Sequence, residues 1–423
     1  MEVGMLVPDG RSASLEEVVS LLSPQRTPQL SPFSDSALAL CAGLSQAIFR
    51  DREAARFPEL LALAFWMRRA ELVSLRSQFR ATSSPELIAV PRGLVFHIPP
   101  SNVDTIFVYS WLLAVLAGNR NCIRMSSRRT PQSEILLRLL RDSLERADQH
   151  LQHNTIIVSY GHNPEITEAL SKACDVRVIW GGDHTVGLIR SVPLAIHARE
   201  MVFPDRSSFA VIRAETYLSL SQQSQQKLAE QFYNDSYWFD QMACSSPKLL
   251  VWCGSGADTR HASQAFWAAL DGCISTRGFA APAAIHMKKL VFSCESILDL
   301  PVSEYYRSRE VTVLTLDSLK NYARQHSGGG LFFTTRVDQL SDLVPFLARK
   351  DQTLTYFGFD TDELTTFAIS LGGKAIDRMV PIGQALQFSR FWDGHDLLRE
   401  FCRFVHIPPP TVDLEPQNDS RRT

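Results

Sequence analysis

The sequence predicts an α/β protein with two domains, each built around a largely parallel sheet. From residue 93 onwards, apolar strand-like segments alternate with helical segments, and the alternation resumes after a long polar helix over 220–239. Parallel strands need a crossover between them, which the intervening helices supply. With 423 residues, of which 45% are hydrophobic, the chain can bury the cores of two or three domains.

The segments before this alternation predict a different kind of structure. Residues 1–35 carry four prolines among serines and predict an irregular arm. Apolar residues recur every three or four positions between 35 and 79, which predicts a helical region. At the other end, residues 408–423 are polar and proline-rich and predict a loosely held tail.

The first α/β unit begins after Pro91. Residues 93–98 predict a strand, 99–102 a turn, 103–118 a helix and 121–125 a second strand. Three further crossovers follow and end in a strand over 208–214. Successive crossovers of this kind favour a doubly wound parallel sheet, the usual scaffold for a dinucleotide.

The second α/β unit begins near residue 215. The polar helix leads into a segment that contains Cys244, and strand 248–253 and helix 261–273 follow. Further strands are predicted over 311–316, 330–335 and 353–359. Cys244, the candidate nucleophile of this unit, lies between a predicted helix and a predicted strand.

Charge and hydropathy exclude several classes of partner. A net charge of -2 and a pI near 6.6 give no general attraction to nucleic acid or to an anionic bilayer. The N-terminus lacks the basic and apolar regions of a secretion signal. The longest apolar stretch, 105–118, is too short to cross a bilayer. We therefore expect a cytoplasmic protein that binds no nucleic acid and has no membrane span.

Eight cysteines are scattered along the chain, without a CxxC pair or a Cys/His cluster at zinc-ligand spacing. This usage indicates a reducing compartment, no disulfide framework and no structural metal. Because a free cysteine packs as a small hydrophobic residue, most buried cysteines are inert. Cys244 is flanked by small residues that would let a substrate approach, so a nucleophile and a packed side chain are both open for it.

Three turns could carry chemistry, each with a simpler explanation. Asn102 follows a strand and precedes a helix, where it or Ser101 could be a helix cap. Gly181 and Gly182, in WGGDHTVG (180–187), could let backbone N–H groups approach a pyrophosphate, or simply form a tight turn. Residues 126–129, Ser-Ser-Arg-Arg, would suit a ribose or a 2′-phosphate, although a solvated basic loop is as common.

The order of these motifs resembles the aldehyde dehydrogenase superfamily and, within it, the LuxC-type long-chain fatty-acyl-CoA reductases. The resemblance covers about residues 85–407. Its most specific segments are GLVFHIPPSNVDTIFVYSWLLAVLAGN (93–119), FDQMACSSP (239–247) and DRMVPIGQALQFSRFWDGHDLL (377–398).

The resemblance implies an aldehyde-dehydrogenase-like fold, with a Rossmann-type parallel-sheet cofactor domain and a second α/β catalytic domain that carries the cysteine. We expect an N-terminal arm and helical region over 1–84, the dinucleotide-binding domain over 85–214 and the catalytic domain over 215–389. Residues 390–423 would return to the first domain and end in a disordered tail.

The resemblance also implies roles for individual residues. Cys244 matches the acyl-accepting nucleophile, and the Asn102 amide would complete an oxyanion hole with the Cys244 backbone N–H. The residues that match cofactor-binding positions are Gly181, Gly182 and Thr185 at the pyrophosphate, and Arg124, Ser126 and Ser127 at the adenosine ribose. Arg124 replaces the usual lysine.

The implied activity is NADPH-dependent reduction of an acyl-CoA to the aldehyde; a cysteine acyltransferase or thioesterase is the alternative. The substrate would be an acyl-CoA or an acyl-carrier thioester, and partners would be a second copy of the chain or an acyl-supplying enzyme. Where ordinary aldehyde dehydrogenases carry a water-activating Glu in an ELGGK-like stretch, this sequence reads EMVFPDRSSF (200–209). A site that does not activate water favours reduction over hydrolysis.

Two further sets of residues remain open. The aromatic residues Tyr233, Tyr237, Trp238 and Phe239 suit either a hydrophobic acyl tunnel or core packing. Asp393 and His395, in FWDGHDLL, could close the acyl pocket from the other domain, and we assign neither a catalytic role.

Overall fold

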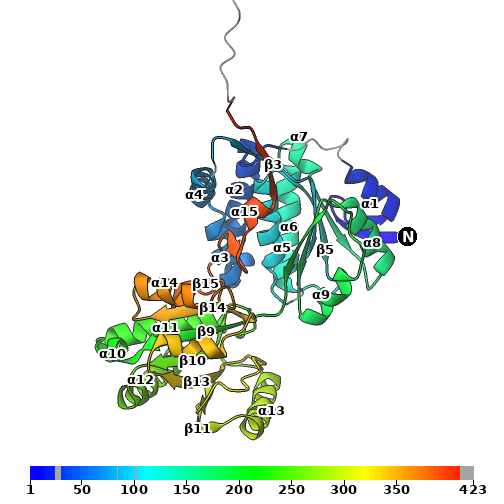
Figure 1. The fold of residues 1–423 in the computed structure, drawn as a ribbon. Coiled ribbons are helices and arrows are strands. Elements are labelled where there is room, and N and C mark those ends of the chain that lie inside the picture. Colours follow the sequence, from blue (N-terminus) through cyan, green and yellow to red (C-terminus); the bar gives the residue numbers. More distant parts are fainter. Residues whose placement is uncertain (24–29, 83, 101, 410–423) are drawn as a thin grey trace, which may run out of the picture.

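Two seven-stranded sheets organise the chain into two lobes (Figure 1). The computed structural model describes residues 1–23, 30–82, 84–100 and 102–409. The prediction of an α/β fold with two largely parallel sheets is confirmed.

The sheet of the first lobe is parallel over five neighbouring strands. Its order is β2 (Arg11–Ser14), β1 (Glu2–Val7), β6 (Thr155–Ser159), β5 (Arg120–Met125), β4 (Leu94–Ile98), β7 (Val176–Trp180) and β8 (Arg199–Phe203). β1 pairs antiparallel to both β2 and β6. The central strands are covered on both faces, which explains their nearly continuous apolar sequences. Parallel strands end at one edge, so the turns after β4, β5 and β7 lie together there.

Helices cover both faces of this sheet (Figure 1). One face carries α5 (Ile106–Leu116), α6 (Pro131–Glu145) and the helices α2 (Asp35–Arg50), α3 (Pro58–Trp66) and α4 (Arg69–Ala81). The other face carries α1 (Leu15–Leu21), α8 (Pro164–Ala173) and α9 (Asp183–Arg190). The short helices η1 (Ala54–Arg56) and α7 (Gln149–Gln152) lie in connections.

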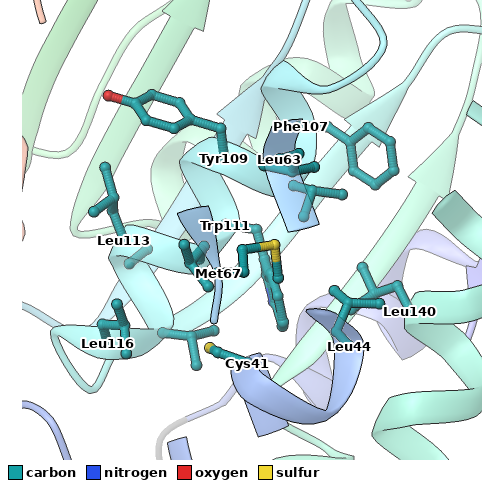
Figure 2. Packing of buried hydrophobic residues seen from close by; sticks show 14 of the residues in the cluster. Cys41, Leu44, Leu63, Met67, Phe107, Tyr109, Trp111, Leu113, Leu116 and Leu140 are labelled. Atoms are coloured by element: carbon teal, nitrogen blue, oxygen red, sulfur yellow. The ribbon is translucent and has the colours of Figure 1, made fainter. Parts of the chain in front are cut away.

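Helix α5 forms the centre of the larger core. All eleven of its residues are buried, and Figure 2 shows Trp111 beside Met67, at the end of α3, and Cys41 of α2. A helix that is apolar all round needs such complete cover. The helix therefore holds the β4–α5 turn firmly against the sheet edge.

The sheet of the second lobe has the order β11 (Val302–Arg307), β12 (Thr312–Leu316), β13 (Leu331–Val337), β10 (Pro247–Cys253), β9 (Ser207–Arg213), β14 (Asp351–Phe357) and β15 (Arg378–Pro381). β11 is antiparallel to its neighbour and the other pairs are parallel. The helical elements of this lobe are α10 (Ala214–Leu218), α11 (Gln222–Tyr237), α12 (Gly256–Arg277), α13 (Ala283–Asp299), η2 (Leu340–Phe346) and α14 (Thr361–Ser370).

The C-terminal segment leaves the second lobe after β15. It forms a hairpin of β16 (Phe391–Trp392) and β17 (His395–Asp396), then α15 (Leu397–Glu400) and β18 (Cys402–His406). β18 pairs antiparallel with β3 (Leu87–Pro91), beside the first lobe. The expected disordered tail over 410–423 lies outside the described residues.

The irregular arm predicted for residues 1–35 is wrong for its first part. Residues 2–7 and 11–14 are strands of the first sheet, and Val3, Met5 and Val7 are buried on alternate positions. The prolines in this region led to the prediction of an irregular arm in spite of the alternating apolar residues. Pro8 does not prevent the strand, because it lies just after β1, in the turn to β2, where it removes no ladder hydrogen bond.

The expected boundary at residue 214 differs from the sheet membership. Strand β9 lies between β10 and β14 in the second sheet, whereas we expected it to be the last strand of the first domain. The chain passes from one lobe to the other over residues 204–206, between two apolar strands. A connection of this length shows no change in composition from which the domain boundary could be predicted.

None of the helices in the described ranges is both long enough and apolar enough to span a bilayer.

Truncation of a side chain in the α5 core should be costly. Leu113 is fully buried, so we expect Leu113→Ala to lower the free energy of unfolding by about 2–5 kcal/mol, because the change removes apolar contacts and leaves a cavity. Urea unfolding followed by circular dichroism measures this. Leu298→Ala is the matched control, because Leu298 is 86% exposed, and an equal loss in both variants would contradict the assigned core.

Candidate active site

A cavity of about 150 Å³ lies where the two lobes meet. Its walls come from the carboxyl edge of the first sheet, through the turns after β4 and β7, and from the segments that enter the amino edge of the second sheet at β9 and β10. The C-terminal segment closes it with Leu386, Phe388, Trp392 and Asp393. The structure brings Asn102, Gly181, Gly182 and Cys244 together in this cavity.

The segment that carries Cys244 is held by a strained backbone and a buried amide. Asp240 and Gln241 both adopt left-handed conformations, with φ of 50° and 64°, which cost energy for residues other than glycine. The buried Gln241 side chain donates to the carbonyls of Pro247 and Leu331 at 2.9 and 2.8 Å and accepts from the Gly330 N–H at 3.0 Å. These bonds fix the loop just before Cys244.

A second contact fixes Cys244 itself. Ser208, at the start of β9, donates its hydroxyl to the Cys244 carbonyl at 2.7 Å and accepts from the Thr353 N–H of β14 at 3.2 Å. The cysteine is therefore tied to both neighbouring strands at the amino edge of the second sheet.

The environment of Cys244 disfavours a free thiolate. Burial raises the pKa of the thiol to about 11, and the negative charge of Asp393 adds to the increase. The charge of Lys248, together with hydrogen bonds from Gln352 and from the Ser245 backbone, opposes it. The thiol is half-buried at the cavity wall and is protonated at neutral pH.

Asn102 is exposed to the cavity in the β4–α5 turn, and its side chain makes no hydrogen bond within the described ranges. The alternative that Asn102 caps the helix is wrong, because the N-cap of α5 is Thr105. The same alternative for Ser101 lies outside the described residues. The Asn102 amide is free to bind a ligand in the cavity.

The turn after β7 fits an anionic group. Helix α9 begins at Asp183, and its N-cap, Gly182, supplies no side-chain bond, so the backbone N–H groups of the first turn can meet an anion. A Cβ added at Gly182 would meet no atom within 4 Å, so the approach is open. The negative charge of Asp183 is balanced by Lys350 Nζ at 3.4 Å. Thr185 is exposed on α9 beside Gly181, outside the cavity lining.

The remaining predicted residues lie at the end of β5 and do not line the cavity. The Arg124 guanidinium lies 4.6 Å from the centre of the Tyr160 ring and donates to the Gly161 carbonyl at 3.3 Å, while its Nε is buried without a partner. Ser126 and Ser127 are exposed immediately after the strand. Because β5 neighbours β4, these side chains share the sheet edge with Asn102. An unpartnered Arg nitrogen and exposed hydroxyls fit a polar dinucleotide group.

Glu200, on β8, is occupied by ion pairs and does not line the cavity. It accepts from Arg177 Nε at 2.8 Å, and Arg190 Nε lies 3.0 Å from its other oxygen. Activation of water at the cysteine is therefore not available to this carboxylate. Strand β8 therefore provides no carboxylate that could activate water at Cys244, as the sequence predicted.

His97 is a packed core residue. It is buried on β4 and bonds to the Ser110 hydroxyl at 2.8 Å and the Asn121 side-chain oxygen at 3.0 Å. Burial lowers its pKa to about 4, so the ring is neutral at physiological pH.

Sequence reasoning did not single out Lys248 and Gln352, whereas Asp393, which could close the pocket from the other domain, lines the cavity. Lys248, four positions after the cysteine, is buried at the cavity and its Nζ donates to the Arg206 carbonyl at 3.4 Å. Burial lowers the Lys248 pKa. Gln352 and Asp393 come from segments more than 100 residues further along the chain, and Gln352 donates to the Asp393 carboxylate. A lysine after CSSP could have been noticed, but sequence spacing cannot reveal Gln352.

The protonated state of Cys244 can be tested by titration. The ultraviolet absorbance of the thiolate, taken as wild type minus Cys244→Ser, should be absent at pH 7 and should rise only as the pH approaches the thiol pKa of about 11. Burial and the Asp393 charge both favour the neutral thiol, which is the reason for this late rise. A thiolate already formed at pH 7 would contradict the assigned environment.

Comparisons with known proteins agree with this geometry. Residues 70–276, close to half of the chain, match the family described as acyl-CoA reductase (LuxC). The matched region contains Asn102 and Cys244 and ends before Asp393. A search of curated protein sequences found no match.

Solved structures share the fold. The salicylaldehyde dehydrogenase from Pseudomonas putida G7, complexed with salicylaldehyde, is 13% identical with a TM-score of 0.65, and the match covers 98% of this chain and 96% of that one. The NADP-dependent glyceraldehyde-3-phosphate dehydrogenase from Bacillus halodurans C-125, complexed with NADP, is 14% identical with a TM-score of 0.62 and 96% of each chain covered. An oxidoreductase from Marinobacter aquaeolei is 11% identical with a TM-score of 0.66, covering 96% and 94%.

The family match and the structural matches come from independent comparisons, and both agree with the motifs that the sequence carries. Over residues 70–276, just under half of its length, this chain therefore matches the LuxC family of acyl-CoA reductases, and its fold is that of the aldehyde dehydrogenases.

Proposed function

We propose that the protein reduces an acyl-CoA to the corresponding aldehyde through an acyl-enzyme on Cys244, with NADPH as the cofactor. The observation that carries the proposal is the placement of Cys244, Asn102 and the Gly181–Gly182 turn around one cavity between the lobes. Nucleophile, oxyanion donor and anion-binding turn are the parts that such a reaction needs in one place.

The first half of the reaction is transfer of the acyl group to sulfur. Cys244 attacks the thioester carbonyl, and the oxygen gains negative charge. The Asn102 amide and the Cys244 N–H, neither of which bonds to any described residue, are available to stabilise that charge. Loss of the CoA thiolate then leaves the acyl-enzyme. Each oxyanion donor typically contributes on the order of 10²–10³ in rate.

The second half reduces the acyl-enzyme to the aldehyde. NADPH, when bound, supplies the hydride. The chain's own residues position the cofactor: the Gly181–Gly182 turn and the N-terminus of α9 would hold the pyrophosphate, and Arg124, Ser126 and Ser127 would hold the adenosine ribose.

Two features of the site would keep water from the thioester. The Trp180 and Phe203 rings stack with centroids 3.8 Å apart at the cavity wall. Glu200 is held in its ion pairs and does not reach the cavity. Hydrolysis to the acid is thereby disfavoured, which supports a reductase over a thioesterase.

A larger apolar cavity supports a fatty acyl substrate. It measures about 810 Å³, within the range typical of small-molecule sites. It shares Leu386 and Phe388 with the cavity at Cys244 and lies between α3, α4 and the end of α11. An acyl chain attached to Cys244 could extend past these two residues into it.

The aromatic residues around 233–239 divide between the two roles left open for them. Tyr233 and Tyr237 belong to the packed core of the second lobe. Trp238 lines the larger cavity and Phe239 lines the cavity at Cys244.

The cysteines of the described chain are unpaired, which supports a cytoplasmic location. A carrier-protein donor, a second copy of the chain and an acyl-supplying enzyme stay predictions.

Removal of the nucleophile should abolish the reaction. We expect Cys244→Ala to form no aldehyde from acyl-CoA and NADPH and to take up no radiolabelled acyl group, because the covalent intermediate cannot form. Asn102→Ala, measured in the same assays, should still be acylated but on the order of 10²–10³ times more slowly.

The same experiment separates the proposal from its alternative. Acyl-CoA-dependent loss of NADPH absorbance, with the aldehyde trapped as it forms, indicates a reductase. Acyl labelling without NADPH consumption would indicate a cysteine acyltransferase or thioesterase. A normal rate with Cys244→Ala would contradict the proposed mechanism. A panel of acyl chains of different length tests the apolar cavity.

The cofactor preference has its own test. We expect a higher kcat/KM for NADPH than for NADH, because the Ser-Ser-Arg-Arg turn after β5 offers hydroxyls and guanidinium groups to a 2′-phosphate. Arg128→Ala should reduce the preference while leaving the NADH reaction nearly unchanged. Equal kcat/KM values for both cofactors in the wild type would overturn the assignment.

A further inference from the structure

We propose that Asp393 is the general base that takes the proton of the Cys244 thiol as the sulfur attacks the substrate. This inference rests on the proposed acyl-enzyme at Cys244. It assigns the catalytic base to the C-terminal segment, outside the region that matches the LuxC family.

The backbone of Asp393 is shaped to present its side chain. Asp393 and Gly394 join β16 to β17, with φ of 49° and 78°. Two central residues with positive φ are typical of a type I′ hairpin turn, for which Asp-Gly is a favoured sequence. Side chains at hairpin tips are usually solvated. Asp393 is only 6% exposed and lines the cavity of Cys244.

Aromatic contacts dock this hairpin onto the first lobe. The Trp392 ring lies 5.5 Å from Tyr109 of α5 and 5.9 Å from Trp180, measured between ring centroids. The Tyr109 hydroxyl also donates to the Ser389 carbonyl at 2.6 Å. The carboxylate that follows Trp392 is thereby carried to the second lobe's side of the cavity.

On that side, Gln352 connects Asp393 to the cysteine. Gln352 is buried at the start of β14 and donates its amide N–H to Asp393. Hydrogen bonding from the same side chain is also one of the influences that lower the pKa of Cys244. Its oxygen is buried without a partner. Cys244 and Asp393 both line the cavity of about 150 Å³, so the sulfur and the carboxylate face the same small space.

The charges around Asp393 leave it able to accept a proton. Burial raises its pKa above the ordinary range, and Arg206, with Nη1 3.7 Å from the carboxylate, opposes the increase. A buried carboxylate of raised pKa is a stronger base than an exposed one. The titratable groups that face it are Arg206, Asp377, His395, Tyr109, Cys244 and Lys248.

Proton transfer keeps one negative charge in the site. Before attack, the charge is on Asp393 and the sulfur is protonated. After transfer, the carboxyl is neutral and the sulfur is negative, close to the positive charge of Lys248. The cavity therefore never holds the Cys244 thiolate and an ionised Asp393 at the same time, and two such charges would repel each other strongly in a buried environment.

The other carboxylates near the cavity are less suited. Asp205 lines the cavity, but it is exposed and paired with Lys350 at 3.2 Å. Glu200 is bound to Arg177 and Arg190. Among the described residues that line the cavity, Asp393 is the buried carboxylate.

The step balances without an added reactant. The S–H bond of Cys244 breaks and an O–H bond forms on Asp393, directly or through one water. The sulfur electron pair forms the S–C bond, and the π pair of the carbonyl moves to oxygen. When the oxyanion collapses, the C–S bond to CoA breaks, and the protonated Asp393 returns its proton to the leaving CoA thiolate.

The test is Asp393→Asn, since asparagine tolerates the left-handed backbone. We expect single-turnover acylation by acyl-CoA at pH 7, followed by radiolabel on the protein, to slow by about 10²–10⁴-fold. The decrease in rate at low pH, which the wild type shows as Asp393 takes up a proton, should be absent. The thiolate titration of Cys244 should move to lower pH, because a neighbouring negative charge is gone. A purely structural role would not combine slower acylation with easier ionisation.

The matched control is Asp396→Asn, in the same hairpin, where Asp396 pairs with Arg390 at 3.5 Å. It should leave the acylation rate and the titration within about twofold of the wild type. Wild-type acylation by Asp393→Asn, or slow acylation with an unchanged pH profile, would overturn the inference.

A second variant guards against misfolding. Asp393→Gly suits the positive φ, and added formate should accelerate its acylation while leaving the wild type and Asp396→Asn unaffected. Absence of rescue in a folded Asp393→Gly protein, judged by circular dichroism, would count against the inference. Acyl labelling of Cys244→Ala would instead overturn the proposed function itself, so the two failures are distinguishable.

Discussion

The cavity at Cys244 exists only while the carboxyl edge of one sheet faces the amino edge of the other. Asn102 and the Gly181–Gly182 turn come from the first lobe, and Cys244, Lys248 and Gln352 come from the second. The aromatic cluster of Tyr109, Trp180, Phe388 and Trp392 secures this placement, because the C-terminal segment that leaves the second lobe packs against rings of the first. Burial of such large rings is the main stabilisation that an interface of this kind can gain.

Low solvent access governs the electrostatics of this cavity. It raises the pKa of the Cys244 thiol and of the Asp393 carboxyl, and it lowers the pKa of the Lys248 ammonium. Each group is shifted toward its neutral form, so small rearrangements of protons involve little free energy. Groups with strongly shifted pKa values gather at functional sites for this reason. The burial that the cavity walls impose is the largest cause of these shifts.

The alternation of apolar segments was enough to predict the two parallel sheets, because buried parallel strands and their crossover helices leave a strong local pattern. It was not enough to place β9, since nothing local distinguishes the last strand of one sheet from an inner strand of another. β1 was missed because prolines near it outweighed a short alternation. Cys244, Asn102 and the glycine turn were found as motifs in a characteristic order, and the structure brings these together.

Gln352 could not be found in that way, and Asp393 was singled out only as a residue that could close the acyl pocket. They lie 108 and 149 positions after Cys244, and Asp393 lines the same cavity as Cys244 while the buried Gln352 donates to Asp393. Asp-Gly signals a hairpin, yet no local pattern tells whether the tip of a hairpin is solvated or inserted between two lobes. Contacts of this kind are a property of the assembled fold.

The left-handed backbone at Asp240 and Gln241 has a consequence for how this loop can change. Glycine would relieve the torsional strain at position 241, but it would leave the carbonyls of Pro247 and Leu331 and the N–H of Gly330 without the partner that Gln241 provides. Gln241 thus supplies hydrogen bonds to three backbone groups while its own backbone adopts a conformation that is unfavourable for a residue with a side chain. Such a position has few acceptable substitutes, and drift in the sequence around the sulfur is correspondingly restricted.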